Sequence, residues 1–258
     1  MWQPEFLQVT TVSARQHGLI TAAQADRLGV QLSPLAGDGL LTLLDWDVYH
    51  VAGTPQDATR DYLRAAWLAL VPDQFAWERA QDAVVSHTSA ARLLGLCAAT
   101  APVITFTAEQ SRAMPRATRL SLGTFDPDEV VVLEGLPVTS ALRTVLDLVA
   151  AGTDAGELRQ ILSTAVRTDR IDLTVLYRQL APAAERFGLP ADGPSFVGEF
   201  LEALDGELSP RNQRALATLA LPSEVERVTT ALQAALEGVD QEILAGLAAE
   251  VVYRSRAH

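Results

Sequence analysis

Residues 18–51 read GLITAAQADRLGVQLSPLAGDGLLTLLDWDVYHV. Within this segment, Thr21–Gln24 has the spacing of a capping box, in which the Thr hydroxyl accepts the N3 amide hydrogen and the Gln side chain reaches back to the N-cap. This spacing predicts a helix that ends at about Leu28. Ser33, followed by Pro34, predicts the N-cap of a second short helix. The segment therefore predicts two short helices separated by a tight turn.

Two apolar segments, Leu40–Leu44 and Val48–Val51, follow the second short helix. Asp45–Asp47 separates them with the length of a hairpin turn. A further helix is expected upstream, over Pro4–His17, because apolar residues recur there at helical spacing. The order helix, helix, turn, helix and two-stranded wing is that of a winged helix-turn-helix.

The charge of this region does not match its pattern. Leu28–Thr59 spans 32 residues without a Lys or Arg. The whole chain has a net charge of −12, and all twenty of its cations are Arg. Affinity for a duplex depends largely on cations that neutralise phosphates. The region thus has the pattern of a DNA-binding domain without most of the charges that bind DNA.

The next part of the chain predicts helices that flank a small sheet. A helix is expected over Thr59–Val71 and another up to Leu94. The spacing of apolar residues then shortens from that of a helix towards that of a strand. Strands are expected over Val103–Thr107, Thr118–Leu122, Val130–Leu133 and Leu136–Thr139. Amphipathic helices are expected over Ala141–Ala150, Asp154–Thr168 and Leu173–Phe187.

Gly188–Pro194 has the composition of a linker, and the chain beyond it predicts helices only. These are Phe196–Leu204, Pro210–Leu219 behind Ser209, Glu224–Leu236 behind Ser223, and Asp240–Tyr253. The expected fold is α+β and mostly helical. It comprises an N-terminal winged helix-turn-helix over residues 1–55, a mixed α/β middle domain with a small sheet over 56–188, and a helical C-terminal extension over 189–258.

Four stretches resemble the AbiEi-type antitoxins, the regulator half of type IV toxin–antitoxin and abortive-infection pairs. The stretches are Gly18–Val30, Asp47–Val51, Val84–Leu96 and Gly135–Leu148. The last, GLPVTSALRTVLDL, is the most specific. The resemblance covers about residues 18–187 and leaves the helical tail without a counterpart.

The resemblance implies an N-terminal winged helix that binds operator DNA and a second domain that opposes a nucleotidyltransferase-like toxin. It also implies a transcriptional regulator that binds DNA as a homodimer, because helix-turn-helix proteins match two half-sites. The sequence departs from this family where a basic face is expected, since Asp45 and Asp47 flank the turn of the expected wing.

Two functions remain open from the residues. In the first, DNA would be read by Gln31 and Ser33, with further contacts from Arg15, Gln24, Arg27 and His50. In the alternative, the chain is an acidic protein-interaction module that keeps the winged-helix fold and no longer binds DNA. The cluster Arg112, Arg116 and Arg119 is a candidate contact for a partner or nucleic acid in either case.

Catalysis has little support. His87 lies between Ser86 and Thr88, which favours helix capping over a nucleophile and base. Arg143 and Asp147 are four residues apart and are expected to form a structural ion pair. The acidic groups Asp126/Asp128/Glu129 and Glu199/Glu202/Asp205/Glu207 have no His or Cys at ligand spacing. We expect no enzymatic activity, no metal and no cofactor.

Composition sets the remaining expectations. Of the 258 residues, 48% are hydrophobic, which predicts a folded protein with a sizeable core. The apolar runs are too short to cross a bilayer, and no signal-peptide pattern opens the sequence. The single Cys97 lies in an apolar run and is expected to be an inert core thiol. A cytoplasmic location without membrane contact is expected.

Overall fold

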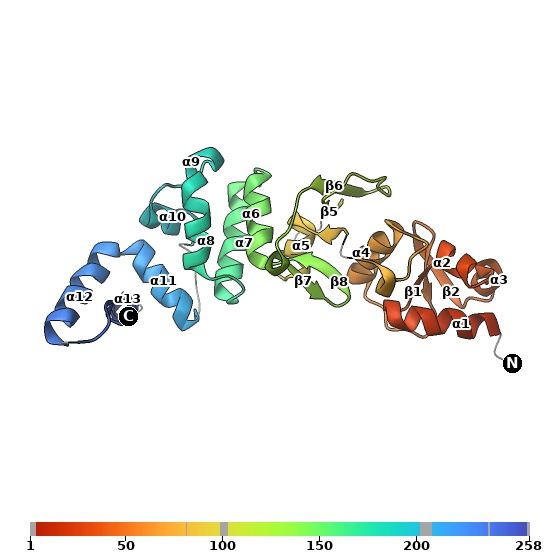
Figure 1. The fold of residues 1–258 in the computed structure, drawn as a ribbon, viewed down its shortest axis with the longest axis horizontal. Helices are drawn as coiled ribbons and strands as arrows, with labels where there is room; N and C mark the ends of the chain where they lie inside the picture. Colours follow the sequence, from red (N-terminus) through yellow and green to blue (C-terminus); the bar gives the residue numbers. More distant parts are fainter. Residues whose placement is uncertain (1–3, 81, 99–102, 202–207, 237, 257–258) are drawn as a thin grey trace. The chain divides into compact units, whose positions relative to one another are not determined.

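The structure, a computed structural model, describes residues 4–80, 82–98, 103–201, 208–236 and 238–256. It is a mixed α+β fold, mostly helical, with two small sheets (Figure 1). The chain divides into two compact units. Unit 1 comprises Met1–Leu93 and Ala99–Ser140, and unit 2 comprises Leu94–Ala98 and Ala141–His258. The expected boundaries after residues 55 and 188 each fall within one unit.

The first part of unit 1 contains three helices and a three-stranded antiparallel sheet. The elements are α1 (Pro4–Ser13), β1 (Leu19–Thr21), α2 (Ala22–Arg27), α3 (Leu32–Gly37), β2 (Leu41–Asp45) and β3 (Val48–Val51). The sheet has the order β1-β3-β2, with Ile20 opposite Tyr49 and Leu43 opposite Tyr49 on its other side. The sequence pattern predicted the hairpin but not β1, because three residues are too few to show a period.

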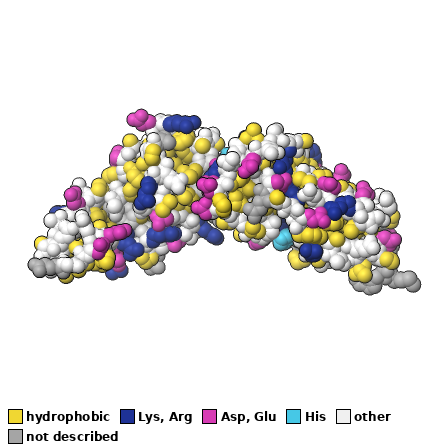
Figure 2. All heavy atoms as spheres, in the orientation of Figure 1, with side chains coloured by type: hydrophobic (Ala, Val, Ile, Leu, Met, Phe, Trp, Pro, Cys, Tyr) yellow, Lys and Arg dark blue, Asp and Glu magenta, His cyan; other side chains and the backbone are white. Residues whose placement is uncertain are grey.

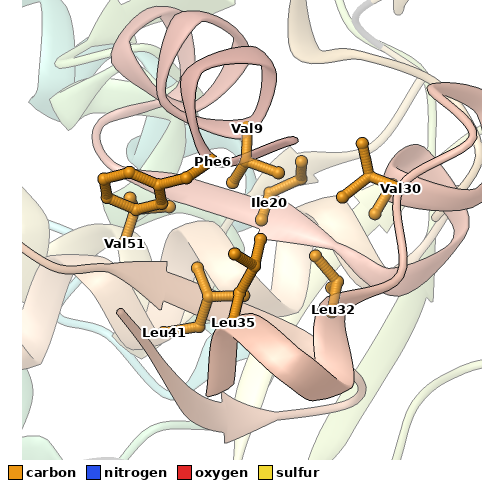
Figure 3. Packing of buried hydrophobic residues seen from close by; sticks show 9 residues of the cluster. Phe6, Val9, Ile20, Val30, Leu32, Leu35, Leu41 and Val51 are labelled. Atoms are coloured by element: carbon orange, nitrogen blue, oxygen red, sulfur yellow. The ribbon is translucent and has the colours of Figure 1, made fainter. Parts of the chain in front are cut away.

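These helices pack on the sheet through one apolar cluster (Figure 3). Its members come from every element of this part: Phe6, Val9, Ile20, Ala25, Val30, Leu32, Leu35, Leu41 and Val51. Burial of each large aliphatic side chain stabilises the fold by about 1.5–3 kcal/mol. The cluster therefore fixes where the short helices lie, although each is too short to be stable alone.

The capping box at the start of α2 is confirmed. The Gln24 amide donates to the Thr21 hydroxyl at 3.0 Å, and the Thr21 amide donates to Gln24 Oε1 at 3.1 Å. The predicted cap of α3 is wrong: Gln31 is the N-cap and makes no side-chain cap bond, while Ser33 lies in the first turn. Burial of Leu32 in the core explains the earlier start, and Pro34 is tolerated in a first turn.

The second part of unit 1 contains two helices and a five-stranded mixed sheet. The elements are α4 (Ala58–Ala69), β4 (Val84–Val85), α5 (His87–Leu93), β5 (Ile104–Ala108), β6 (Thr118–Leu122), β7 (Val130–Leu133) and β8 (Leu136–Thr139). The strand order is β6-β5-β4-β8-β7. The four predicted strands are confirmed. The central β4 was missed because it has two residues, both buried, directly before a helix.

Unit 2 is helical. Its helices are α6 (Ala141–Ala150), α7 (Ala155–Arg167), α8 (Leu173–Leu180), α9 (Ala184–Phe187), α10 (Gly193–Phe200), α11 (Pro210–Ala220), α12 (Pro222–Ala235) and α13 (Gln241–Arg256). The predicted caps Asp172 and Ser209 are confirmed, whereas Leu221 rather than Ser223 precedes α12. None of the described helices is both long and apolar enough to span a bilayer.

Buried Asn212 joins the tail to the helices that precede it. Its Oδ1 accepts the Leu173 amide at 3.0 Å, and its Nδ2 donates to the carbonyls of Val166 and Ile171 at 3.1 and 3.0 Å. Replacing Asn212 would leave these buried backbone groups without partners and would lower the stability of the fold. The predicted linker Gly188–Pro194 therefore lies inside unit 2: its first five residues connect α9 to α10, and Gly193 and Pro194 begin α10.

Gly18 provides a test of the packing between β1 and the segment after β3. Its φ is +82°, and a Cβ there would lie 2.2 Å from Thr54 Oγ1 and 2.8 Å from Thr54 Cβ. Gly18→Ala is expected to lower the free energy of unfolding in urea by about 2–4 kcal/mol, from backbone strain plus overpacking. Gly29→Ala is the control, because Gly29 has a φ of +70° with nothing within 4 Å. Equal losses in the two variants would contradict the close approach.

Candidate functional site

The β2–β3 hairpin has an unusual tip. Its two central residues, Trp46 and Asp47, have φ values of 51° and 55°. Such left-handed pairs match the twist of a hairpin, but Asn and Gly normally occupy them, and a bulky residue there is strained. The Asp45 side chain accepts the Trp46 amide at 2.9 Å. Strain of this kind persists only where the surroundings hold the residue in place.

Contacts from the second part of unit 1 hold this tip. Trp46 Nε1 donates to the carbonyl of Arg116 at 3.0 Å, and the indole lies 4.7 Å from the Tyr62 ring. The Arg116 guanidinium donates to both Asp45 carboxylate oxygens, at 2.7 and 2.6 Å. These four residues, Asp45, Trp46, Tyr62 and Arg116, form what we term the hairpin latch. The latch turns the tip toward the body of unit 1.

A groove lies beside the latch, with a volume of about 660 Å³. It is lined by Thr21, Ala22, Ala23, Asp26, Trp46, Asp47, Ala69, Leu70, Pro72, Ala113, Met114 and Pro115. Most of these side chains are apolar, and two carboxylates, Asp26 and Asp47, are exposed. Within the described part of the chain, no Arg lines this hairpin groove. Its chemistry suits a ligand that combines an apolar side chain with a positive charge.

Burial removes two of the residues predicted to contact DNA. Gln24 is fully buried. Its side-chain amide group is occupied by hydrogen bonds with the Thr21 amide, with Gln16 and with the carbonyl of Gln74. His50 is 2% exposed and faces Thr54 Oγ1 at 3.2 Å and the carbonyl of Pro55 at 3.3 Å. The prediction that these two side chains meet a duplex is therefore wrong. A helix or strand pattern alone does not show which polar residues point inward.

Two predicted cations lie at the surface but are engaged. Arg27 makes a bidentate pair with Glu78, at 2.8 and 3.2 Å. This hydrogen bond, followed by the Phe75 amide, holds the pKa of Glu78 below its usual range. Arg15 stacks its guanidinium 3.8 Å from the centre of the Trp77 ring. Any phosphate would have to compete with these contacts.

Gln31 and Ser33 are exposed, at the start of α3. Both side chains are therefore accessible to a ligand, and the prediction that they read DNA bases stays a prediction. The adjoining strand β2 exposes Leu43 and Leu44, and neither carries charge. This face therefore offers polar and apolar side chains without phosphate-binding cations.

The arginine cluster of the sequence separates in space. Arg112 donates to Asp82 Oδ2 at 2.5 Å, while Arg116 belongs to the hairpin latch. Burial raises the pKa of Asp82, but the hydrogen bond from Arg112 and the charge of Arg79 outweigh it and hold that pKa below the ordinary value. Arg119 is exposed on β6 and makes no ion pair with any residue that the structure describes. Acidic and basic side chains are interspersed on the face shown in Figure 2.

An ionic cluster, buried except at Glu134, lies where α4 meets the β7–β8 turn. Arg64 donates to Asp61 Oδ1 and to Glu134 Oε2, both at 3.1 Å. Asp61 in turn accepts the Asp57 amide at 2.8 Å and lies 3.8 Å from His50 Nε2. Glu134, with a φ of 49°, also offers its carbonyl to Arg64. The approach of Asp61 to His50 links this cluster to the first part of unit 1.

His87 and Arg143, which the sequence analysis considered as possible catalytic residues, make contacts that stabilise the fold. His87 Nδ1 lies 2.9 Å from Ser86 Oγ, but Ser86 is fully buried and accepts a hydrogen bond from Thr107. A substrate has no access to that hydroxyl. Arg143 Nε donates to Asp147 at 2.8 Å, as the spacing predicted. Among the described residues, no group of three His, Cys, Asp or Glu is arranged to hold a metal ion.

Compared with protein-family models and with curated proteins, the chain matches none.

Arg116 provides a test of the hairpin latch. Arg116→Ala removes the bidentate pair with Asp45, and the amides of residues 43–49 are expected to exchange hydrogen about fivefold faster, as suits an exposed ion pair. Arg119→Ala removes an exposed Arg three residues away and should leave that peptide unchanged. Mass spectrometry of deuterium uptake measures both. Equal uptake in the two variants would show that the ion pair does not hold the tip.

His17 provides a pH test of the surroundings of Arg64. Partial desolvation of its ring and the nearby charge of Arg64 lower the pKa of His17, against smaller opposing effects of Glu134 and Asp61. The unfolded chain therefore binds more protons below about pH 6.5, so stability should fall as pH drops from 7.5 to 5.5. His17→Asn, which tolerates the φ of 55°, should reduce this fall in urea midpoint. An unchanged pH dependence would contradict the assignment, and pH 7.5 to 8.5 is the control interval.

Proposed function

We propose that unit 1 is an acidic protein-binding module that captures a basic and apolar segment of a partner protein in the hairpin groove. The observation that carries the proposal is the hairpin latch. It holds the tip of the expected wing against α4 and the β5–β6 connection, and Trp46 and Asp47 then form one wall of an acid-rimmed groove.

Electrostatics supports a protein partner over a duplex. The exposed carboxylates Asp26 and Asp47 would repel phosphate and attract Arg or Lys. The net charge of −12 adds a long-range field of the same sign. Arg27, which the sequence analysis assigned to DNA, and Arg116, which it assigned to a partner or nucleic acid, are paired with carboxylates of this chain. The partner surface that complements this module is basic.

The element order supports a regulator of the AbiEi antitoxin type. Three short helices and a three-stranded antiparallel sheet follow one another as in a winged helix. In that reading the partner is a nucleotidyltransferase-like toxin, and the hairpin groove binds one of its basic segments. The module would then act by occupying the partner and not by excluding other proteins from an operator.

Operator binding is the second candidate function, and the exposure of Gln31 and Ser33 favours it. Gln can bond an adenine edge in the major groove. With few free cations nearby, such binding would be weak and would depend little on salt. A homodimer would be needed to combine two half-sites.

Selection of a random peptide library on the full-length protein tests the groove. Enriched peptides are expected to combine Arg or Lys with a neighbouring apolar residue. The variant Asp26→Asn/Asp47→Asn should bind a selected peptide at least about tenfold more weakly, because charge-assisted bonds are lost. Asp126→Asn/Asp128→Asn removes two exposed carboxylates elsewhere in unit 1 and is the matched control.

Equal weakening of peptide binding by both double variants would contradict the proposal, since it would show that binding depends on net charge alone. A mobility-shift series with the DNA upstream of the gene separates the second candidate. A sequence-dependent shift that Gln31→Ala abolishes would favour operator binding. No shift at low salt would remove it.

A further inference from the structure

The last helix, α13, has apolar side chains on two adjacent faces. Ala248 and Val252 are buried in the cluster that α13 forms with α11 and α12. Ile243, Leu247 and Val251 lie on the neighbouring face and are 57%, 45% and 53% exposed. Their spacing of four residues places them in one row along the helix. A contiguous exposed row of this kind is a candidate interaction surface.

Charged residues of opposite sign end this row, which we term the α13 stripe. Asp240 precedes the helix, and its carboxylate accepts the amides of Glu242 and Ile243 at 2.8 and 3.4 Å. Arg254 lies in the last turn, where its side chain is 71% exposed and pairs with Glu250 of the same helix at 2.6 Å, so its outward side is what a second chain would meet. Asp240 is seven residues before Leu247, and Arg254 is seven residues after it. Two turns of helix span seven residues, so all five positions share one side.

We propose that the α13 stripe binds a second copy of this chain, with the two α13 helices antiparallel about a two-fold axis at Leu247. In this arrangement Ile243 of one copy faces Val251 of the other. Asp240 faces Arg254 at both ends of the contact. An interface around a two-fold axis must be complementary to itself, and the order acid, apolar, apolar, apolar, base satisfies that requirement only when the helices are antiparallel.

Charge excludes the parallel pairing, because it would set Asp240 against Asp240 and Arg254 against Arg254. The size of the contact limits its strength. A helix of 16 residues is about 24 Å long, so a single helix pair buries less than a standard interface. A dissociation constant on the order of micromolar is expected for such a contact. The contact lies in unit 2 and does not depend on what the hairpin groove binds.

Sedimentation equilibrium of the full-length protein over a concentration series tests the pairing. Leu247→Arg places two guanidinium groups together at the axis and is expected to raise the dissociation constant about 100-fold. The matched control is Leu7→Arg, which changes a Leu that is 61% exposed on α1. A protein that is monomeric at every concentration, or a dimer that Leu247→Arg leaves intact, would overturn the proposal.

A distance measurement tests the direction of the helices. A spin label at Ser255→Cys, in a Cys97→Ala background, lies eight residues from the proposed axis. In the antiparallel pair the two labels are separated by about 24 Å along the helices. In a parallel pair they lie side by side, about 10 Å apart. A short distance in the dimer would therefore contradict the proposed register.

Discussion

Unit 1 depends on how the tip of its first hairpin is held. Trp46 and Asp47 both adopt left-handed conformations, which cost free energy for residues other than Gly and Asn. The Asp45 carboxylate offsets this cost, since it accepts the Trp46 amide and both hydrogen bonds of Arg116. Because Asp45 and Arg116 are 71 residues apart, the same interaction closes the tertiary structure around the hairpin groove.

Three other arginines of unit 1 also pair with carboxylates of the same chain. Arg27 pairs with Glu78, Arg64 with Asp61 and Glu134, and Arg112 with Asp82. Each exposed pair contributes little to stability by itself, but the pairs Arg27–Glu78, Arg64–Glu134 and Arg112–Asp82 join segments that are distant in the sequence. The planar guanidinium suits them because it donates to a carboxylate and a carbonyl together. Arginines paired in this way are less available to phosphates.

Unit 2 carries a second and separate capacity for interaction. The helical tail is part of this unit, because Asn212 on α11 saturates its buried amide with backbone groups of the α7–α8 connection. One face of α13 packs on α11 and α12, and its neighbouring face remains exposed. A partner-binding groove in unit 1 and a self-association surface in unit 2 would let the dimer present two copies of the groove.

Much of the fold was readable from local sequence. The capping box Thr21–Gln24, the hairpin around Asp45–Asp47, four strands of the second sheet and the caps Asp172 and Ser209 all follow from short-range chemistry. Strands β1 and β4 did not, because two or three residues carry no period and their partners lie elsewhere in the chain. Ser33 and Ser223 were wrong as caps: α3 begins one residue earlier at the buried Leu32, and Pro222 occupies the first position of α12.

The site was less predictable than the fold. Sequence alone determined the charge: a chain of −12 whose cations are all Arg, with none between Leu28 and Thr59. It also determined that Asp45 and Asp47 stand at the hairpin turn. Only the tertiary structure decided that Gln24 and His50 point inward, that Arg116 meets Asp45, and that the tip forms one wall of a groove. The physical reason is that capping and turn formation act over a few residues, whereas burial and ion pairing depend on segments that folding brings together from far along the chain.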